Sequence, residues 1–151
     1  MSDKPEKLEI EFDDGSNVTA TLLWDEAPQT CRAIVDALPA ESDTLHAQWA
    51  GSELYFEDFP TDEDVPFENT TSRSEDFLLT NKISGGVLAF YVNPDVRSFC
   101  FVYDDIIPRR KVDTQIELNV FATIDDPEKA KEIGKRSRRE GPPKMTVSVA
   151  G

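Results

Sequence analysis

The sequence is poor in the residues that build metal centres and disulfide frameworks. It has 2 cysteines and 1 histidine among 151 residues. Cys31 and Cys100 stand far apart, and neither has a CxxC or CxxH motif beside it. This spacing argues against a zinc knuckle or a disulfide framework. Both cysteines lie among apolar residues, so we expect them to be buried as small hydrophobic side chains. No metal and no cofactor is predicted.

Long apolar runs are also lacking. The longest uninterrupted run extends only from Val87 to Val92, whereas a membrane-spanning helix needs about 20 such residues. The N-terminal residues are polar and carry no signal-peptide pattern. We therefore expect a single cytoplasmic domain over residues 1–151 that has no membrane partner, since this length suits one hydrophobic core.

Positive charge is scarce, because 16 lysines and arginines face 30 aspartates and glutamates, for a net charge of -14. Free nucleic acid is therefore not an expected partner, since it binds clustered cations. The acidity reflects either an ordinary acidic protein or adaptation to high salt, and only in the second case should molar KCl stabilise the fold.

The charge is unevenly distributed along the chain. Residues 1–105 hold 23 acidic and 6 basic side chains, whereas residues 106–151 hold 7 and 10. The basic residues near the C-terminus could complement the negative end of a helix. They could also form a docking surface for an acidic partner or a contact in a homo-oligomer.

Alternation of apolar and polar residues dominates the chain and predicts β-strands. Such a pattern covers residues 8–12 and 18–24, and Asp14-Gly15 between them is a hairpin signal. Further strands are expected at 44–50, 53–57, 86–92, 98–103, 115–124 and 145–149.

Two segments have helical periodicity instead. The first begins at Pro28, carries apolar residues at helical spacing up to Leu38, and ends at Pro39. The second is expected at 127–139, with Asp126 as its N-cap. Many strands and two helices predict a mostly β fold, a closed or nearly closed antiparallel barrel with a short α-helix at each end.

Four short segments, in this order along the chain, resemble segments of the cyclophilins, which are peptidyl-prolyl isomerases. More closely, they resemble a prokaryotic cyclophilin-like family of unknown function. The segments are Ala27-Pro28-Gln29-Thr30, His46-Ala47-Gln48-Trp49-Ala50-Gly51, Glu68-Asn69-Thr70-Thr71 and Val120-Phe121-Ala122-Thr123-Ile124. The resemblance implies a cyclophilin-like barrel of about eight strands with two helices, and it implies no established activity.

The resemblance does not extend to the catalytic residues of the isomerases. Cyclophilins polarise the prolyl amide with an arginine on their third strand, but residues 33–72 of this chain contain no arginine. The residues at the positions of the cyclophilin proline pocket are Asp113, Thr114 and Leu118. Isomerase activity is therefore not expected unless another cation, such as Arg73 or Arg97, takes the place of the missing arginine.

A small-molecule enzyme is a second hypothesis. Histidine is the side-chain type best suited to proton transfer near neutral pH, and His46 could act with Glu68 as acid and base. A Cys–His nucleophile would require Cys31 or Cys100 beside His46. The simpler interpretation is that His46 is a hydrogen-bonded residue of the barrel.

The preferred hypothesis is a non-enzymatic binding module for a small metabolite or a peptide segment, with a groove at the mouth of the barrel. The aromatic residues proposed to line it are Trp49, Tyr55, Phe90, Tyr91 and Phe121. The complete set of candidate ligand-binding residues is His46, Trp49, Tyr55, Glu68, Asn69 and Phe121.

The acidic segment 57–68 could offer carboxylates to a hard cation, but it lacks the glycine and the ligand spacing of a calcium loop. We expect instead a loop pinned by Phe59 and Phe67 with solvated acids. At its end, Glu68 could face a pocket or accept backbone N–H bonds as a loop cap.

Overall fold

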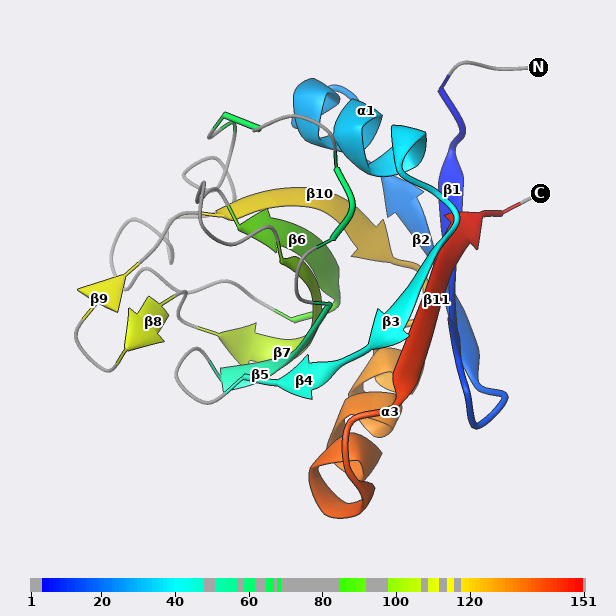
Figure 1. Cartoon of the computed structure of the whole chain (residues 1–151), viewed down its shortest axis with the longest axis vertical. Helices are drawn as coiled ribbons and strands as arrows, with labels where there is room; N and C mark the ends of the chain where they lie inside the picture. The colour runs from blue at the N-terminus through cyan, green and yellow to red at the C-terminus, as the bar shows by residue number, and fades with distance from the viewer. Residues whose placement is uncertain are drawn as a thin grey trace.

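The computed structural model of the chain is shown in Figure 1. It describes residues 4–47, 51–56, 59–61, 65–66, 68, 85–91, 98–106, 109–111, 114–115 and 118–150. The strands of the main sheet are β1 (Lys7–Phe12), β2 (Asn17–Leu22), β3 (Ala40–Asp43), β4 (Leu45–His46), β5 (Gly51–Phe56), β6 (Val87–Tyr91), β7 (Phe99–Ile106), β10 (Leu118–Ile124) and β11 (Lys144–Val149). A separate pair consists of β8 (Arg109–Lys111) and β9 (Thr114–Gln115).

The main sheet is antiparallel and its order is β3-β11-β1-β2-β10-β6-β7-β5-β4. The two outermost strands, β3 and β4, follow one another directly in the chain and are separated only by Thr44. The Thr44 backbone N–H and hydroxyl both donate to the carbonyl of Pro143, at 3.2 and 2.5 Å. The sheet therefore closes on itself through one interrupted strand, and counting β3 and β4 together gives the expected barrel of eight strands.

The largest difference from the predicted strands occurs at this closure. The strand expected at 44–50 instead occupies 40–43 and 45–46, and Ala40–Asp43 pairs with β11 from Ala40 opposite Val147 to Asp43 opposite Lys144. Residues 40–43 have no apolar alternation, so their strand conformation comes from pairing rather than from their own pattern. The β1–β2 hairpin is as expected, with Gly15 at φ 93° in its turn.

Both expected helices form, one at each end of the barrel (Figure 1). Helix α1 (Pro28–Asp36) stops two residues before Leu38. Helix α3 (Pro127–Glu140) begins at the expected N-cap, where the Asp126 carboxylate accepts the N–H of Lys129 at 3.1 Å. No helix in the part of the chain that the structure describes is long and apolar enough to cross a membrane.

The interior of the barrel is filled by aromatic side chains. Phe59 stacks on Phe99 with ring centroids 5.1 Å apart, and Phe99 meets Phe121 edge to face at 5.6 Å. Phe56 and Phe90 contact Phe59 from other directions. These five rings are at most 3% exposed. The prediction that Phe59 pins the acidic segment is confirmed, whereas Phe67 lies outside the described residues.

A second apolar cluster involves the opposite face of the strands β5, β7, β6 and β10. Its fully buried members alternate with the interior residues along these strands, because successive side chains of a strand point to opposite faces. They are Ala89, Cys100, Val102, Ile106 and Val120, with Leu23, Ala47, Tyr55 and Val87 packed against them. The chain therefore buries apolar side chains on both faces of this part of the barrel.

Asp125 connects the end of β10 to the first hairpin. Its carboxylate accepts hydrogen bonds from Lys7 Nζ at 2.9 Å and from the hydroxyls of Thr19 and Thr21 at 2.7 Å. Partial burial raises the pKa of Asp125, but the hydrogen bonds from Lys7, Thr21 and Thr19 and the charge of Lys7 outweigh it, so the pKa is lowered from 3.8.

Because the pKa of Asp125 is lower in the folded state, its carboxylate stabilises the fold above the pKa of the unfolded chain, and this contribution is lost as the pH falls through the folded value. Asp125→Asn should therefore reduce the free energy of unfolding by on the order of 1 kcal/mol at pH 7 and by less at pH 3. Urea titrations at the two pH values measure the difference. Asp36→Asn, which removes an exposed carboxylate paired with Arg32 one helical turn away, is the control. An equal loss for Asp125→Asn at both pH values would contradict the expectation.

Candidate functional site

His46 is a hydrogen-bonded residue of the barrel wall, as the simpler interpretation predicts. Its Nε2 lies 2.6 Å from the Tyr103 hydroxyl, and its Nδ1 lies 2.9 Å from the carbonyl of Ala47. Since a carbonyl can only accept, Nδ1 carries the proton and Nε2 accepts from the tyrosine. Both ring nitrogens therefore have partners within the protein.

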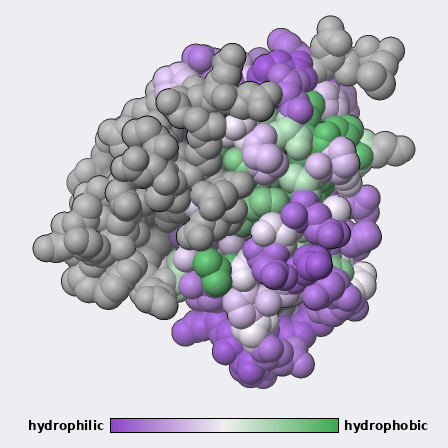
Figure 2. All heavy atoms as spheres, in the orientation of Figure 1, coloured by the Kyte–Doolittle hydropathy of each residue, from purple (hydrophilic) through white to green (hydrophobic). Residues whose placement is uncertain are grey.

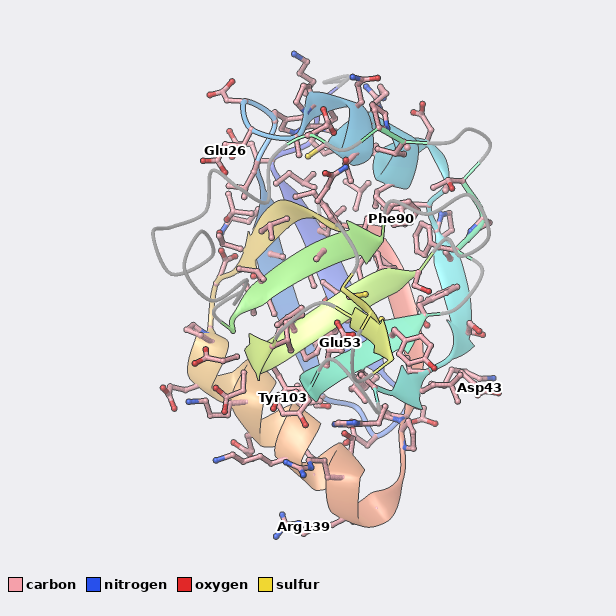
Figure 3. All side chains as sticks on the ribbon, turned by 90° about the vertical axis from the view of Figure 1, so that its left-hand side faces the viewer. Glu26, Asp43, Glu53, Phe90, Tyr103 and Arg139 are labelled. Carbon is pink, nitrogen blue, oxygen red and sulfur yellow. The ribbon has the colours of Figure 1, made fainter. Side chains whose placement is uncertain are left out.

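Tyr103 joins this histidine to helix α3. Its ring is 2% exposed and lies between β7 and the helix (Figure 3). Burial raises the pKa of Tyr103, and the charge of Arg138 and hydrogen bonds with Ser52 and Arg138 only partly offset this effect. The ring packs against Gly134, where an added Cβ would overlap the ring carbons. This end of the barrel is thus held together by a close contact between the helix and the tyrosine.

Glu68 caps helix α1 from a distant part of the sequence. Ala27 occupies the N-cap position and has no side chain that can accept a hydrogen bond. The Glu68 carboxylate accepts instead from the backbone N–H groups of Gln29 and Thr30, at 3.1 and 2.8 Å, and from the Thr30 hydroxyl at 2.6 Å. A carboxylate at this end of a helix also complements the macrodipole. The expected capping role of Glu68 is confirmed, and its partner is the first turn of α1.

Asn119 on β10 completes this capping network from the barrel side and is fully buried. Its amide donates to the Thr30 hydroxyl and to the carbonyl of Pro66, both at 2.8 Å. Its carbonyl oxygen accepts the N–H of Glu68 at 2.6 Å. One side chain therefore ties β10, α1 and the segment 65–68 together, and every polar atom of its amide group has a partner.

His46 and Glu68 belong to separate hydrogen-bond networks. His46 bonds Tyr103 of β7 and the carbonyl of Ala47, whereas the partners of Glu68 lie on α1 and β10. The two helices are at opposite ends of the barrel (Figure 1). Trp49 and Asn69, the other polar-site candidates, lie outside the described residues.

The described aromatic candidates lie on two faces of the sheet. Phe90 and Phe121 are 2% and 0% exposed and belong to the packed interior. Tyr55 belongs to the second apolar cluster, on the opposite face. The groove at the mouth of the barrel stays a prediction. The side chain of Tyr91 is not among those described.

On that opposite face, a carboxylate is buried among apolar side chains. Glu53 is 1% exposed and sits on β5 opposite Val102 of β7. Figure 3 looks onto this face, with Glu53 near its middle. Tyr55 is opposite Cys100 in the next row of the sheet. Ser98 precedes β7 by one residue, is 1% exposed, and its hydroxyl has no hydrogen-bond partner.

Both thiols are held in their protonated form. Burial raises the pKa of Cys31 to about 12, where the nearby Glu68 charge adds to the effect. Burial raises the pKa of Cys100 well above 9.0, and the charge of Glu53 and a hydrogen bond with it act in the same direction. A thiol needs to ionise before it acts as a nucleophile, and neither cysteine contacts His46. The geometry gives no support to a Cys–His pair, and both cysteines are buried as expected.

The residues that the sequence did not indicate are Glu53, Ser98, Tyr103 and Asn119. Glu53 occupies the polar position of an alternating strand, which normally faces solvent. Asn119 is the one of the four with a usable signal, because it interrupts an apolar run with a polar amide. Among the described residues, no three His, Cys, Asp or Glu side chains come together as a metal site could require. Most of the acidic segment 57–68 lies outside the described residues.

Comparisons with known proteins agree with the fold. A model of the DUF3830 family, described as a protein of unknown function, matches residues 11–95. No curated protein sequence matches the chain.

Three solved structures share the fold. McbB in complex with tryptophan has a TM-score of 0.65 at 18% identity, and the match covers 95% of this chain but only 45% of McbB. The hypothetical protein AF2241 from Archaeoglobus fulgidus has a TM-score of 0.60 at 21% identity, and the match covers 97% of this chain and 96% of AF2241. The Mimivirus cyclophilin has a TM-score of 0.52 at 14% identity, over 97% of this chain and 88% of its own. At these identities the matches establish a cyclophilin-like fold.

Proposed function

The chain belongs to the DUF3830 family of proteins of unknown function, and from its geometry we propose that it is a non-catalytic binding protein. Its ligand is a small molecule or peptide terminus that carries an amino or other cationic group. The ligand site is the outer face of β5 and β7, around Glu53.

The position of Glu53 is the observation that carries this proposal. A carboxylate among apolar side chains lies in a region of low dielectric constant, where it attracts a cationic group more strongly than it would in water. Protein sites that keep such a group are often sites of recognition or chemistry. Glu53 lies on a face whose neighbours are Cys100, Val102 and Tyr55, away from the aromatic interior.

The surroundings of Glu53 define the chemistry of the ligand. Apolar side chains beside one carboxylate favour a ligand with a hydrophobic body and a cationic group. Ser98, the residue before β7, adds a buried hydroxyl without a hydrogen-bond partner, which suits a polar group of the ligand. Rows of a sheet are about 7 Å apart along a strand, so the span from Glu53 to Ser98 suits a molecule of amino-acid size or larger. McbB, which shares the fold, has been determined in complex with tryptophan.

An enzymatic role has less support. His46 is engaged with Tyr103 and Ala47, Glu68 caps a helix, and both thiols are protonated. Arg73 and Arg97, the cations that an isomerase would need, lie outside the described residues. The resemblance to cyclophilins is therefore evidence for the fold, and it gives no support to isomerase activity.

The proposal predicts that the protein binds its ligand more weakly when Glu53 is replaced with an uncharged residue. In a thermal-shift screen of amino acids, amines and peptides, tryptophan included, some cationic compounds should raise the melting temperature of the wild type. Glu53→Gln keeps the shape of the side chain and should weaken the binding of those compounds about tenfold or more, since a lost charge-assisted hydrogen bond in a buried site costs about 1.5–3 kcal/mol. Isothermal titration calorimetry of the strongest compound measures the change.

Glu11→Gln is the matched control, because Glu11 is an exposed strand residue on β1 and the substitution changes the net charge equally. It should bind like the wild type. Undiminished binding to Glu53→Gln, or a screen in which only anionic compounds bind, would contradict the proposed site.

A further inference from the structure

Helix α3 carries a row of cations along a groove in an otherwise acidic protein. A groove of about 750 Å³ runs between the helix and the β1–β2 turn, where Ser16 forms part of its wall. Lys131, Lys135 and Arg139 follow one another at four-residue spacing along it. Figure 2 shows hydrophilic residues covering this lower end of the molecule, and Figure 3 shows Arg139 extending outward from the end of α3.

The helix macrodipole accounts for only part of this row. Its stabilising effect on cations is confined to the last turn, which contains Arg139 but not Lys131 or Lys135. Like charges four residues apart destabilise a helix by a few tenths of a kcal/mol per pair. The macrodipole therefore does not explain the two lysines in the middle of the helix.

Within the part of the chain that the structure describes, these three cations also have no ion-pair partner. Elsewhere in the described ranges, Lys7 pairs with Asp125, and Arg32 pairs with Asp36 and lies over Trp24. On α3 itself, Arg136 pairs with Asp14 of the β1–β2 turn at 2.9 Å. No described residue forms an ion pair or hydrogen bond with Lys131, Lys135 or Arg139.

Most carboxylates in the groove lie at the end formed by the first turn of α3. Asp126 caps the first turn and Glu128 lies within it, which leaves Glu132 as the one acid between the cations. At physiological ionic strength the Debye length is about 8 Å. A ligand in the groove therefore experiences the local cations more than the net charge of the whole protein.

We propose that this groove binds an extended, acidic peptide segment of a partner protein. Residues four apart on a helix are separated by about 6 Å along its axis. Alternate side chains of an extended strand are separated by about 6.7 Å. A segment with an acidic residue at every second position can thus place one carboxylate opposite each of the three cations, independently of the site around Glu53.

The test uses a fluorescein-labelled peptide of alternating glutamate and serine, (Glu-Ser)5, with (Lys-Ser)5 as its reversed-charge counterpart. Fluorescence anisotropy at low salt should show saturable binding of the glutamate peptide alone, which weakens as salt is added. Replacing Lys131, Lys135 and Arg139 together with glutamine should weaken binding about tenfold, as three exposed ion pairs are lost. Lys135 and Arg139 are exposed, Lys131 is half-buried, and glutamine is a good helix former, so the variant should fold.

The matched control replaces Lys4, Lys7 and Arg32, none of which lines the groove, with glutamine, which removes the same positive charge. It should bind within about twofold of the wild type. Equal weakening by both triple variants would show that only net charge matters and would overturn the proposal. Binding of the lysine peptide as tightly as the glutamate peptide, or no saturable binding by the wild type, would overturn it as well.

Discussion

Replacing Gly134 with alanine is expected to lower the melting temperature by about 4–8 °C, although alanine is the better helix former. The added methyl group would overlap Cγ and both Cδ atoms of Tyr103. The tyrosine cannot easily move aside, because it is 2% exposed and its hydroxyl is bonded to His46 at 2.6 Å. Relief of the overlap therefore requires α3 to shift away from the barrel.

The size of the effect follows from two opposing terms. Glycine to alanine in a helix gains about 1 kcal/mol, whereas severe overpacking costs about 3 kcal/mol or more. For a domain of this size, each net kcal/mol lowers the melting temperature by about 2–4 °C. Thermal unfolding followed by circular dichroism measures the result.

Two further variants isolate the cause. Lys135→Ala changes the neighbouring exposed position of the same helix and should shift the melting temperature by less than about 2 °C. Combining Gly134→Ala with Tyr103→Ala should cost less than the sum of the two single changes, because the second removes the ring that the methyl group meets. Additive losses would contradict a direct contact as the cause.

The elements that could be predicted from the sequence are those whose signals are local. Pro28, Asp126 and Pro127 mark helix starts by their own chemistry, and both helices begin there. Asp14-Gly15 forms the expected turn, with Ser16 bonded to the Asp14 carboxylate. In each case the residue interacts with others a few positions away, so one short segment of the sequence contains both partners of the interaction.

Elements that depend on distant partners could not be predicted in the same way. β3 is a strand because β11 pairs with it. The capping role of Glu68 could be inferred, but not that it would serve α1, about 38 residues earlier in the chain. Glu53 has the pattern of a solvent-facing residue, yet it is 1% exposed, on a face of β5 and β7 where distant parts of the chain form a second apolar cluster.

The second large effect is expected at Asn119. Asn119→Ala removes three hydrogen bonds at once and leaves the Glu68 N–H and the Pro66 carbonyl without this partner. Each buried polar group left unsatisfied costs about 1–3 kcal/mol, so the free energy of unfolding should fall by about 3 kcal/mol. Urea denaturation measures the loss. Asn17→Ala, at a half-buried strand position whose amide bonds Glu9, should cost less than about 1 kcal/mol and serves as the control.

A double-mutant cycle tests whether Asn119 and Glu68 act as one unit. Glu68→Ala alone should destabilise the protein by about 1–2 kcal/mol, because the first turn of α1 loses its only side-chain cap among the described residues. The Thr30 hydroxyl donates to Glu68 and accepts from Asn119, so the loss of either partner weakens the bond to the other. The double variant should therefore lose about 1 kcal/mol less than the sum of the single variants. Strict additivity would mean that the two side chains stabilise α1 independently, and that Glu68 caps the helix equally well without Asn119.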